Sequence, residues 1–396
     1  MLEQYKKEKL DYIQIIRAIA FLGVFLSHTG IKAFSASGAW GVSVFFILSG
    51  FLMTYNYYGK SRIRQIGIKD NLLFSFCKIK KLYFLHILMI CAELLLFFCQ
   101  SETLGIRAWI NEGSKVLLNV CLLQAWIPKN NIYFSLNGVS WYLSVCCFLY
   151  FLFPWFLKLL ETLGKNRRNV KNSIIVIYVF QIILCYGFSI IPVADVIRDD
   201  FVHWGTYILP ITRMGDFLIG CNLGYLFITK SNIQTSNIIC KMKASFMCVV
   251  IVLQWKIHVF FYDMFSKAVP HPETWWMNTV FFSITSCCLI YIFAQVQWGS
   301  ENIIIKSIRK ILIYVGDISS YGFLIHLVVI RYIRISIKYF SGKSIQGTVV
   351  LAISSFIITI IISEIYRWLE KKIGYSQASL VLCQDLVQNK MRGSAS

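Results

Sequence analysis

The chain has 396 residues, of which 57% are hydrophobic and 15% are charged, and its mean hydropathy is +0.63. Soluble domains carry roughly 25% charged residues, so this composition excludes an ordinary soluble protein and indicates an integral membrane protein. The net charge of +20 would suggest nucleic-acid binding in a soluble protein. Here the Lys and Arg residues form short clusters between apolar runs, where they set membrane orientation. We therefore expect membrane lipids as partners and no nucleic acid.

Apolar runs long enough to cross a bilayer recur along the whole chain. With about 20 apolar residues taken as one crossing, the sequence predicts an all-α integral membrane protein with about ten transmembrane helices. Glu93 and Lys256 each interrupt one of the runs. The predicted spans are 12–33, 39–58, 82–99, 141–160, 173–191, 208–228, 244–262, 276–296, 319–338 and 347–365.

The distribution of Lys and Arg between alternate connections predicts the orientation. With the amino terminus inside, the inner tails and loops hold 26 of these residues and the outer loops hold seven. Cytoplasmic loops are enriched in Lys and Arg, and an error of one span would remove the imbalance. The sequence therefore predicts that both termini lie inside.

One membrane domain over residues 1–375 is expected, followed by a polar tail at 376–396 that we expect to be cytoplasmic. The first apolar segment is not followed by a small-residue cleavage site, so we expect it to be retained. In the longest outer loop, the run "KVLLNVCLLQAW" at 115–126 is too short to cross and favours a re-entrant or surface-lying helix. The thirteen cysteines include no CxxC pair and no Cys/His cluster at zinc-ligand spacing, so no metal site is expected.

The first predicted span carries an arginine and a histidine, Arg17 and His28. Because they are eleven residues apart, they share one helix face at an axial separation of about 16 Å. A charge inside a span usually faces the protein interior, although Arg17 could also snorkel to the inner interface. Histidine suits general-base work near neutral pH, but a histidine near a helix end can equally be a hydrogen-bonded interfacial residue.

The sequence resembles the membrane-bound acyltransferase family 3, of the polysaccharide O-acyltransferase type, over nearly its whole length. The family's first helix has an Arg, ten residues and a His, as at Arg17 and His28, and its second helix has "GVxxFFxxSGF", matched by "GVSVFFILSGF" at 41–51. The further matches, in order, are "KIKK" at 78–81 to an RxxR element, "WYLSVC" at 141–146 to WSLSxE, "TRMGDFLIG" at 212–220 to Rxx[ED]FLxG, "SSYGFLIH" at 319–326 to SYxLYLxH, and "YRWLEK" at 366–371 to YRxxE.

Three positions depart from the family pattern. Cys146 stands where the family often has Glu, Lys78 and Lys81 replace arginines, and Phe84 stands where Pro is common. Lysine cannot reproduce the bidentate fork of arginine on a phosphate, but it remains a point charge for one. Any role of a carboxylate at 146 in orienting a base or substrate must be met elsewhere or be absent.

The resemblance implies transfer of an acyl group, acetyl above all, from acyl-coenzyme A to a hydroxyl of a cell-surface or lipid-linked saccharide. Acyl-coenzyme A is then a donor substrate, no cofactor is tightly bound, and the location is the inner cell membrane. We expect His28 and Arg17 to act in catalysis, with His28 either as general base or as a transient carrier of the acyl group. Together with the predicted topology, the motifs assign Lys78, Lys81 and His326 to the donor, and Ser49, Trp141, Ser144, Arg213 and Asp216 to the acceptor.

The predicted topology divides these residues between the two halves of the membrane. Lys78, Lys81, Arg17 and His326 fall in the inner half, where cations suit the phosphates of a donor arriving from the cytosol. The outer half holds aromatic, hydroxyl and carboxylate groups that suit a sugar acceptor, namely those of Trp141, Ser144, Arg213 and Asp216, together with His28.

Structural roles compete with these functional ones. Ser49 could serve close helix packing, Arg213 and Asp216 could pair with each other, and His326 could be a buried core histidine. The cluster Arg331, Arg334 and Lys338 reads as an interfacial anchor. The alternative function is a transporter or flippase for a lipid-linked glycan, since many spans with intramembrane charge also describe such proteins.

Overall fold

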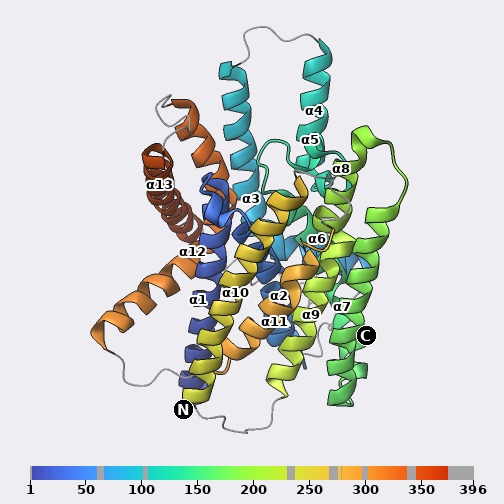
Figure 1. Ribbon diagram of the computed structural model, residues 1–396, viewed down its shortest axis with the longest axis vertical. Helices are drawn as coiled ribbons and strands as arrows, with labels where there is room; N and C mark the ends of the chain where they lie inside the picture. The colour runs from blue at the N-terminus through green and yellow to red at the C-terminus, as the bar shows by residue number, and fades with distance from the viewer. Residues whose placement is uncertain are drawn as a thin grey trace, which may run out of the picture.

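The computed structural model describes residues 2–59, 67–100, 106–229, 237–266, 275–277, 279–296, 302–336 and 345–372. Over these residues the fold is a bundle of helices without strands (Figure 1). The elements are α1 (Leu2–His28), η1 (Lys32–Phe34), α2 (Ser37–Tyr57), α3 (Ile68–Gln100), α4 (Ile106–Val120), η3 (Gln124–Trp126), α5 (Asn130–Tyr133), α6 (Trp141–Leu163), α7 (Arg167–Ile190), α8 (Asp195–His203), η4 (Trp204–Ile208), α9 (Pro210–Ile228), α10 (Asn237–Ser266), α11 (Thr279–Phe293), α12 (Ile303–Ser336) and α13 (Ile345–Lys372).

Eight helices are long and apolar enough to cross a membrane, namely α1, α2, α3, α6, α7, α10, α12 and α13. The all-α membrane fold class is therefore confirmed. The other two predicted spans coincide with α9, which contains Arg213, Asp216 and Asn222, and with α11, which has 15 residues. The number ten and the inside position of both termini stay predictions. The predicted tail at 376–396 lies outside the described residues.

Two helices begin more than ten residues before the spans predicted for them. The α3 helix starts at Ile68 instead of 82, and α12 starts at Ile303 instead of 319. Hydropathy locates the apolar centre of a helix, whereas helical hydrogen bonding continues through basic turns that lower the hydropathy. As a consequence, Lys78 and Lys81 lie within α3 and not before it.

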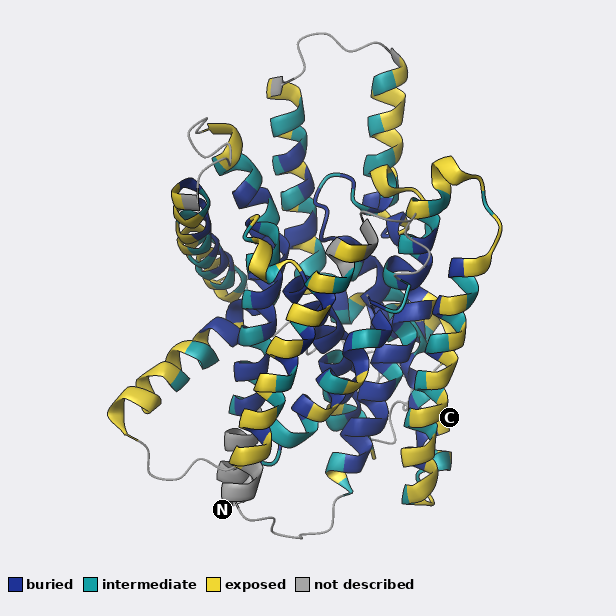
Figure 2. Cartoon of the chain, viewed as in Figure 1, coloured by how far each residue is buried: buried dark blue, intermediate teal, exposed yellow. Residues whose placement is uncertain are grey.

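The centre of the bundle is formed by α2 and α9, which pack against each other more extensively than any other pair. A Cβ on Gly50 would overlap the Phe217 carbonyl oxygen, and one on Gly220 would overlap the carbonyl of Ile47. The two backbones therefore touch, and only glycine fits at these positions. Figure 2 shows the resulting buried core, with exposed residues confined mainly to the peripheral helices.

The α1 and α12 helices run parallel in close contact. A Cβ on Gly316 would overlap the Gln14 carbonyl oxygen, and further along the two helices Arg334 Nη2 donates to the carbonyl oxygen of His28, at 3.2 Å. Parallel packing agrees with the prediction that both helices cross in the same direction. The same contacts fix the register that builds the candidate site.

The segment after α4 folds over one end of the bundle instead of continuing as a helix. Only the first half of the "KVLLNVCLLQAW" run at 115–126 belongs to α4, which ends at Val120. Beyond it, the Leu122 carbonyl accepts a hydrogen bond from Ser144, and the Ala125 carbonyl accepts one from Trp204 Nε1 at 2.9 Å. Asn137 Nδ2 donates to the Leu324 carbonyl at 2.7 Å. These bonds tie the segment to α6, η4 and α12.

Candidate active site

Two histidines from opposite ends of the sequence meet where α1 ends against α12. Nδ1 of His28 lies 3.3 Å from Nε2 of His326. His28 is half-buried, as the last residue of α1, whereas His326 is fully buried. His28 therefore presents the pair to the outside of the bundle, and His326 supports it from within.

Backbone carbonyls assign the neutral tautomers of both rings. His28 Nδ1 lies 2.8 Å from the Val24 carbonyl oxygen, and His326 Nδ1 lies 3.1 Å from that of Gly322. A carbonyl oxygen only accepts, so each Nδ1 carries the proton. His326 Nε2 then holds a lone pair toward His28 Nδ1–H, and Nε2 of His28 is left as the basic nitrogen. An oriented base of this kind is what proton abstraction from a hydroxyl requires.

An aromatic shell surrounds the inner histidine. The ring centroids of Phe21, Phe25 and Phe323 lie 6.2, 6.1 and 6.1 Å from that of His326. On the open side, Arg334 Nη2 donates to the carbonyls of His28 and Thr29 at 3.2 Å, where it caps the carboxyl end of α1. The guanidinium therefore compensates the partial negative charge at that helix end and holds His28 in place.

The prediction that His326 lies with the inner cations is wrong. It assumed that the helix starts at 319, which puts residue 326 two turns from the inner end. The contact of 3.3 Å between His326 Nε2 and His28 Nδ1 overturns this prediction, because His28 ends α1 and Arg17 lies eleven residues, about 16 Å, earlier on that helix. The alternative that His326 is a buried core histidine agrees with its burial and with its Gly322 hydrogen bond, but its contact with His28 goes beyond that alternative.

Arg17 lies further along the same α1 face, and it is half-buried. Its Nη1 donates to Gln14 Oε1 at 3.4 Å, and its charge interacts with Tyr142, Tyr150 and Asp317. These partners direct the Arg17 side chain toward α6 and α12, which favours an interior position over snorkelling to the inner interface.

Cys146, which replaces the family's common Glu, lies among the same groups, hydrogen-bonded to Tyr142 and Tyr150. Near Arg17 the chain thus offers tyrosine hydroxyls and a thiol where the family often has a carboxylate. Tyr150 in turn shares a hydrogen bond of 2.7 Å with Ser49. This bond occupies the Ser49 hydroxyl and links α2 to α6.

Lys78 and Lys81 lie on α3 with different partners. Lys78 Nζ donates to the hydroxyl of Tyr57. Lys81 Nζ lies 3.3 Å from Glu370 Oε2 and 4.4 Å from the centroid of the Tyr321 ring, and its charge interacts with that of Arg17. Glu370 belongs to the "YRWLEK" motif, so the structure brings the third, ninth and last predicted spans together around Lys81.

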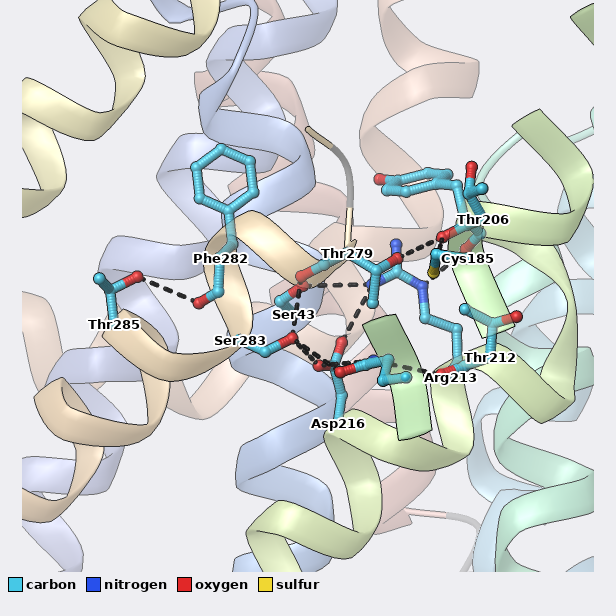
Figure 3. Close-up of polar contacts among 12 residues, drawn as sticks. Ser43, Cys185, Thr206, Thr212, Arg213, Asp216, Thr279, Phe282, Ser283 and Thr285 are labelled. Carbon is cyan, nitrogen blue, oxygen red and sulfur yellow. Dashed lines mark hydrogen bonds and ion pairs between the residues drawn. The ribbon is translucent and has the colours of Figure 1, made fainter. Parts of the chain in front are cut away.

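Arg213 and Asp216 form a buried ion pair with each other, as the alternative to a role in acceptor binding predicted. Arg213 Nη1 lies 3.0 Å from Asp216 Oδ2, and both side chains are fully buried. Figure 3 shows the Ser283 hydroxyl donating a hydrogen bond to Asp216, and Arg213 donating one to the Ser43 hydroxyl. The guanidinium also lies 4.2 Å from the ring of Tyr207. The pair therefore connects α9 to α2, α11 and η4.

Trp141 and Ser144 are both buried at the start of α6. The Trp141 ring packs against Tyr207 and Phe46 at centroid distances of 5.2 and 6.2 Å, and the Ser144 hydroxyl is bonded to the Leu122 carbonyl. Trp141 thus joins the Arg213 cluster and not the histidine pair. A role of either residue in acceptor binding stays a prediction.

Arg331 has a partner that the sequence did not indicate. Its Nη1 forms an ion pair with Glu93, whose side chain is 4% exposed, and donates to the Leu136 carbonyl at 3.2 Å. Leu136 has a positive φ of 55°, a conformation that strains a residue with a branched side chain. Arg331 is therefore held by a carboxylate on another helix, and its interpretation as an interfacial anchor stays a prediction.

No cluster of side chains suited to a metal ion occurs in the described part of the chain, where three or more His, Cys, Asp or Glu residues never gather. The site is therefore built from histidine, arginine, lysine and hydroxyl groups. These groups can bind anions and move protons.

Comparisons with known proteins identify the family. A model of the acyltransferase domain family matches residues 10–368. The chain is 23% identical over 282 residues to the Regulator of hypoxia-inducible factor 1 of Caenorhabditis elegans, covering 59% of this chain and 54% of that protein. It is 26% identical over 174 residues to the Acyltransferase MdmB of Streptomyces mycarofaciens, covering 40% and 42%. The chain thus matches about half the length of these curated relatives. No solved structure matches it.

Proposed function

The chain belongs to this acyltransferase domain family, and on that premise we propose that it transfers an acyl group from acyl-coenzyme A to a hydroxyl of a cell-surface glycan. Membership in the family and the similarity to one named acyltransferase support acyl transfer in general. The observation that carries the proposal is the His28–His326 pair, which leaves Nε2 of His28 as an oriented base.

His28 acts as the general base in this proposal. Its Nε2 removes the proton from the acceptor hydroxyl as the oxygen attacks the thioester carbonyl. The C–O bond forms, the C–S bond breaks, and the proton passes from Nε2 to the departing thiolate. While His28 is protonated, the lone pair of His326 Nε2 and the Val24 carbonyl both accept from Nδ1–H, so the imidazolium is stabilised without a carboxylate.

The donor binds along the face of α1 that carries Arg17 and His28, with Lys81 at the Arg17 end. Lys78 and Lys81 attract the phosphates of coenzyme A from the side where the amino terminus lies, which the charge imbalance predicts to be cytosolic. Arg17 lies between these lysines and the histidine pair, about 16 Å from His28 along the axis. An extended pantetheine arm spans such a distance, so the thioester reaches His28 near the opposite side of the inner cell membrane.

The acceptor approaches His28 from its open side. Arg213 and Asp216 satisfy each other within the bundle, which favours a structural role for them. The backbone at Leu136 and the Asn137 side chain are hydrogen-bonded to α12 at Arg331 and Leu324, which lie on either side of His326 in the sequence. A saccharide hydroxyl that enters there meets Nε2 of His28 without crossing the packed core.

Transfer of radiolabel from acetyl-coenzyme A to surface polysaccharide, in membranes that contain the protein, tests this function. Lys78→Ala and Lys81→Ala should each raise the KM for the donor by roughly tenfold, the value of one charged hydrogen bond. Lys69→Ala removes the same charge from an exposed position of α3 and should leave the KM unchanged. Glycan movement across vesicles without any acyl transfer would instead support the flippase alternative.

A further inference from the structure

The first third of α12 projects from the bundle. It is the orange helix at the lower left of Figure 1, and Figure 2 shows it as mostly exposed. The buried residues of α12 all fall between Val315 and Ile330. Before that point, Ile303 is 76% exposed and Ile311 is 62% exposed. A helical segment rich in isoleucine is thus mostly exposed from Ile303 to Ile311, with protein contacts increasing from Leu312 onward.

The length of α12 shows that this segment is not needed to cross the membrane. A helix of 34 residues is about 51 Å long, whereas the hydrocarbon core of a bilayer is about 30 Å thick. The 22 residues from Val315 to Ser336 suffice for one crossing at about 33 Å. The first twelve residues must therefore leave the hydrocarbon core or lie along its boundary.

From Ile304 to Ile311 the segment has one apolar face and one basic face. At 100° per residue, Ile304, Ile308 and Ile311 fall within about 60° of one another. Lys306, Arg309 and Lys310 lie on the opposite side within about 100°. From 303 to 313 the chain contains no carboxylate. This pattern is typical of helices that lie in a membrane interface, with isoleucines among acyl chains and cations among head groups.

We propose that residues 303–314 bind anionic phospholipid head groups on the side of the membrane where the amino terminus of α1 lies. Polybasic segments next to a span gain free energy from each Lys or Arg near an anionic surface. The charges favour anionic lipid over a second copy of this segment as the binding partner, because two copies would bring their three cations each against one another. This proposal does not depend on acyl transfer.

The direction of the segment is held where it leaves the bundle. The Tyr314 hydroxyl donates to Glu364 Oε2 at 3.1 Å, and the Arg367 guanidinium lies 5.3 Å from the Tyr314 ring. Both partners lie on α13. The segment therefore extends from a fixed point, which presents its two faces in a defined orientation.

Hydrogen–deuterium exchange of the full chain in lipid nanodiscs tests the proposal. Amides at 303–314 should exchange more slowly in discs that contain phosphatidylglycerol than in discs of phosphatidylcholine alone. Each cation near an anionic surface contributes about fivefold to the affinity for that surface. The double variant Lys306→Gln/Lys310→Gln should therefore accelerate amide exchange in the anionic discs by up to about 25-fold. The matched control Lys165→Gln/Lys171→Gln removes two exposed charges elsewhere on the predicted inner side and should retain the protection.

A second variant tests the apolar face. Ile304→Ser/Ile308→Ser keeps all cations but removes insertion into acyl chains, so protection should also decrease. The proposal is overturned if wild-type exchange at 303–314 is the same in both kinds of disc. It is also overturned if protection rises with the number of copies per disc and not with phosphatidylglycerol, because a second copy would then be the occupant.

Discussion

Nδ1 of His28, the last residue of α1, lies 3.3 Å from Nε2 of His326 in α12. The two residues are 298 positions apart in the chain, and the parallel packing of α1 and α12 brings them together. Because His326 is fully buried and bonded to Gly322, its ring is fixed and its lone pair can only serve His28. In the proposed reaction, His28 is the catalytic residue and His326 is its positioning residue.

The first prediction concerns His326. His326→Ala removes the acceptor for His28 Nδ1–H, so kcat should fall by about 10- to 100-fold, as misplacement of a catalytic group does. The KM for acyl-coenzyme A should change little, because His326 is remote from Lys78 and Lys81. Steady-state kinetics of the purified variant separate the two parameters.

A double-mutant cycle distinguishes positioning from mere structural support. If His326 acts through His28, then His28→Ala/His326→Ala should be no slower than His28→Ala alone, since residues that work as a unit are not additive. Additive losses would mean that the two rings act independently, and the pairing argument would then be wrong.

The second prediction concerns the Glu93–Arg331 ion pair, whose arginine also donates a hydrogen bond that holds the Leu136 carbonyl against α12. Arg331→Met should release this backbone and raise the KM for the glycan acceptor by roughly tenfold, the value of one charged hydrogen bond. The KM for the donor should not change. Initial rates at varied concentrations of each substrate provide the comparison.

Two controls accompany this measurement. Arg198→Met removes another arginine of the predicted outer side and should leave both KM values unaltered. The exchange Glu93→Arg/Arg331→Glu restores opposite charges and should recover part of the acceptor affinity. Equal increases in both KM values would show that Arg331 supports the fold in general and not the acceptor side.

The third prediction concerns the buried pair of Arg213 and Asp216. Asp216→Leu leaves a buried guanidinium without its carboxylate, which should cost about 3–5 kcal/mol of stability. The double variant Arg213→Met/Asp216→Leu removes both charges and should recover most of that loss. Thermal unfolding in detergent measures the effect, with Arg367→Ala at the more exposed pair with Glu364 as a control expected to cost under about 1 kcal/mol. If the double variant is as unstable as the single one, repacking fails and the charges themselves are needed.

The fourth prediction concerns the contact between α2 and α9. Gly50→Ala places a methyl group against the Phe217 carbonyl, so it should destabilise the protein by about 1–3 kcal/mol, the usual cost of overpacking. Gly187→Ala is the matched control, because a Cβ there meets nothing within 4 Å and alanine is the better helix former. Equal melting temperatures for Gly50→Ala and wild type would show that the two helices separate easily.

The sequence predicted the elements of the fold better than their ends. Apolar runs located the helices, because burial in lipid requires long apolar segments. The starts of α3 and α12 were missed, since amphipathic basic turns remain helical without being apolar. The late start assumed for α12 also grouped His326 with Arg17 and the lysines, whereas His326 contacts His28.

Local pairs could be predicted and distant pairs could not. Arg213 and Asp216 are three residues apart on one helix, and their pairing follows from helix geometry. The contacts of His28 with His326 and of Glu93 with Arg331 depend on how separate helices are placed, which helical periodicity within one segment does not determine. In the sequence, Glu93 stands out only as a charged residue that interrupts an apolar run, and this intramembrane position was the one signal that a partner existed.

The most direct test of the account is acyl transfer by the His28→Ala variant. Membranes with wild type, His28→Ala and His258→Gln are incubated with radiolabelled acetyl-coenzyme A and surface polysaccharide. His258→Gln is the control, since that ring packs against Phe282 on a different part of the bundle. Loss of a general base predicts transfer about 10²–10⁴-fold slower for His28→Ala, with normal membrane insertion and near wild-type transfer for the control. Transfer by His28→Ala at the wild-type rate would contradict the assignment of His28 as the catalytic base.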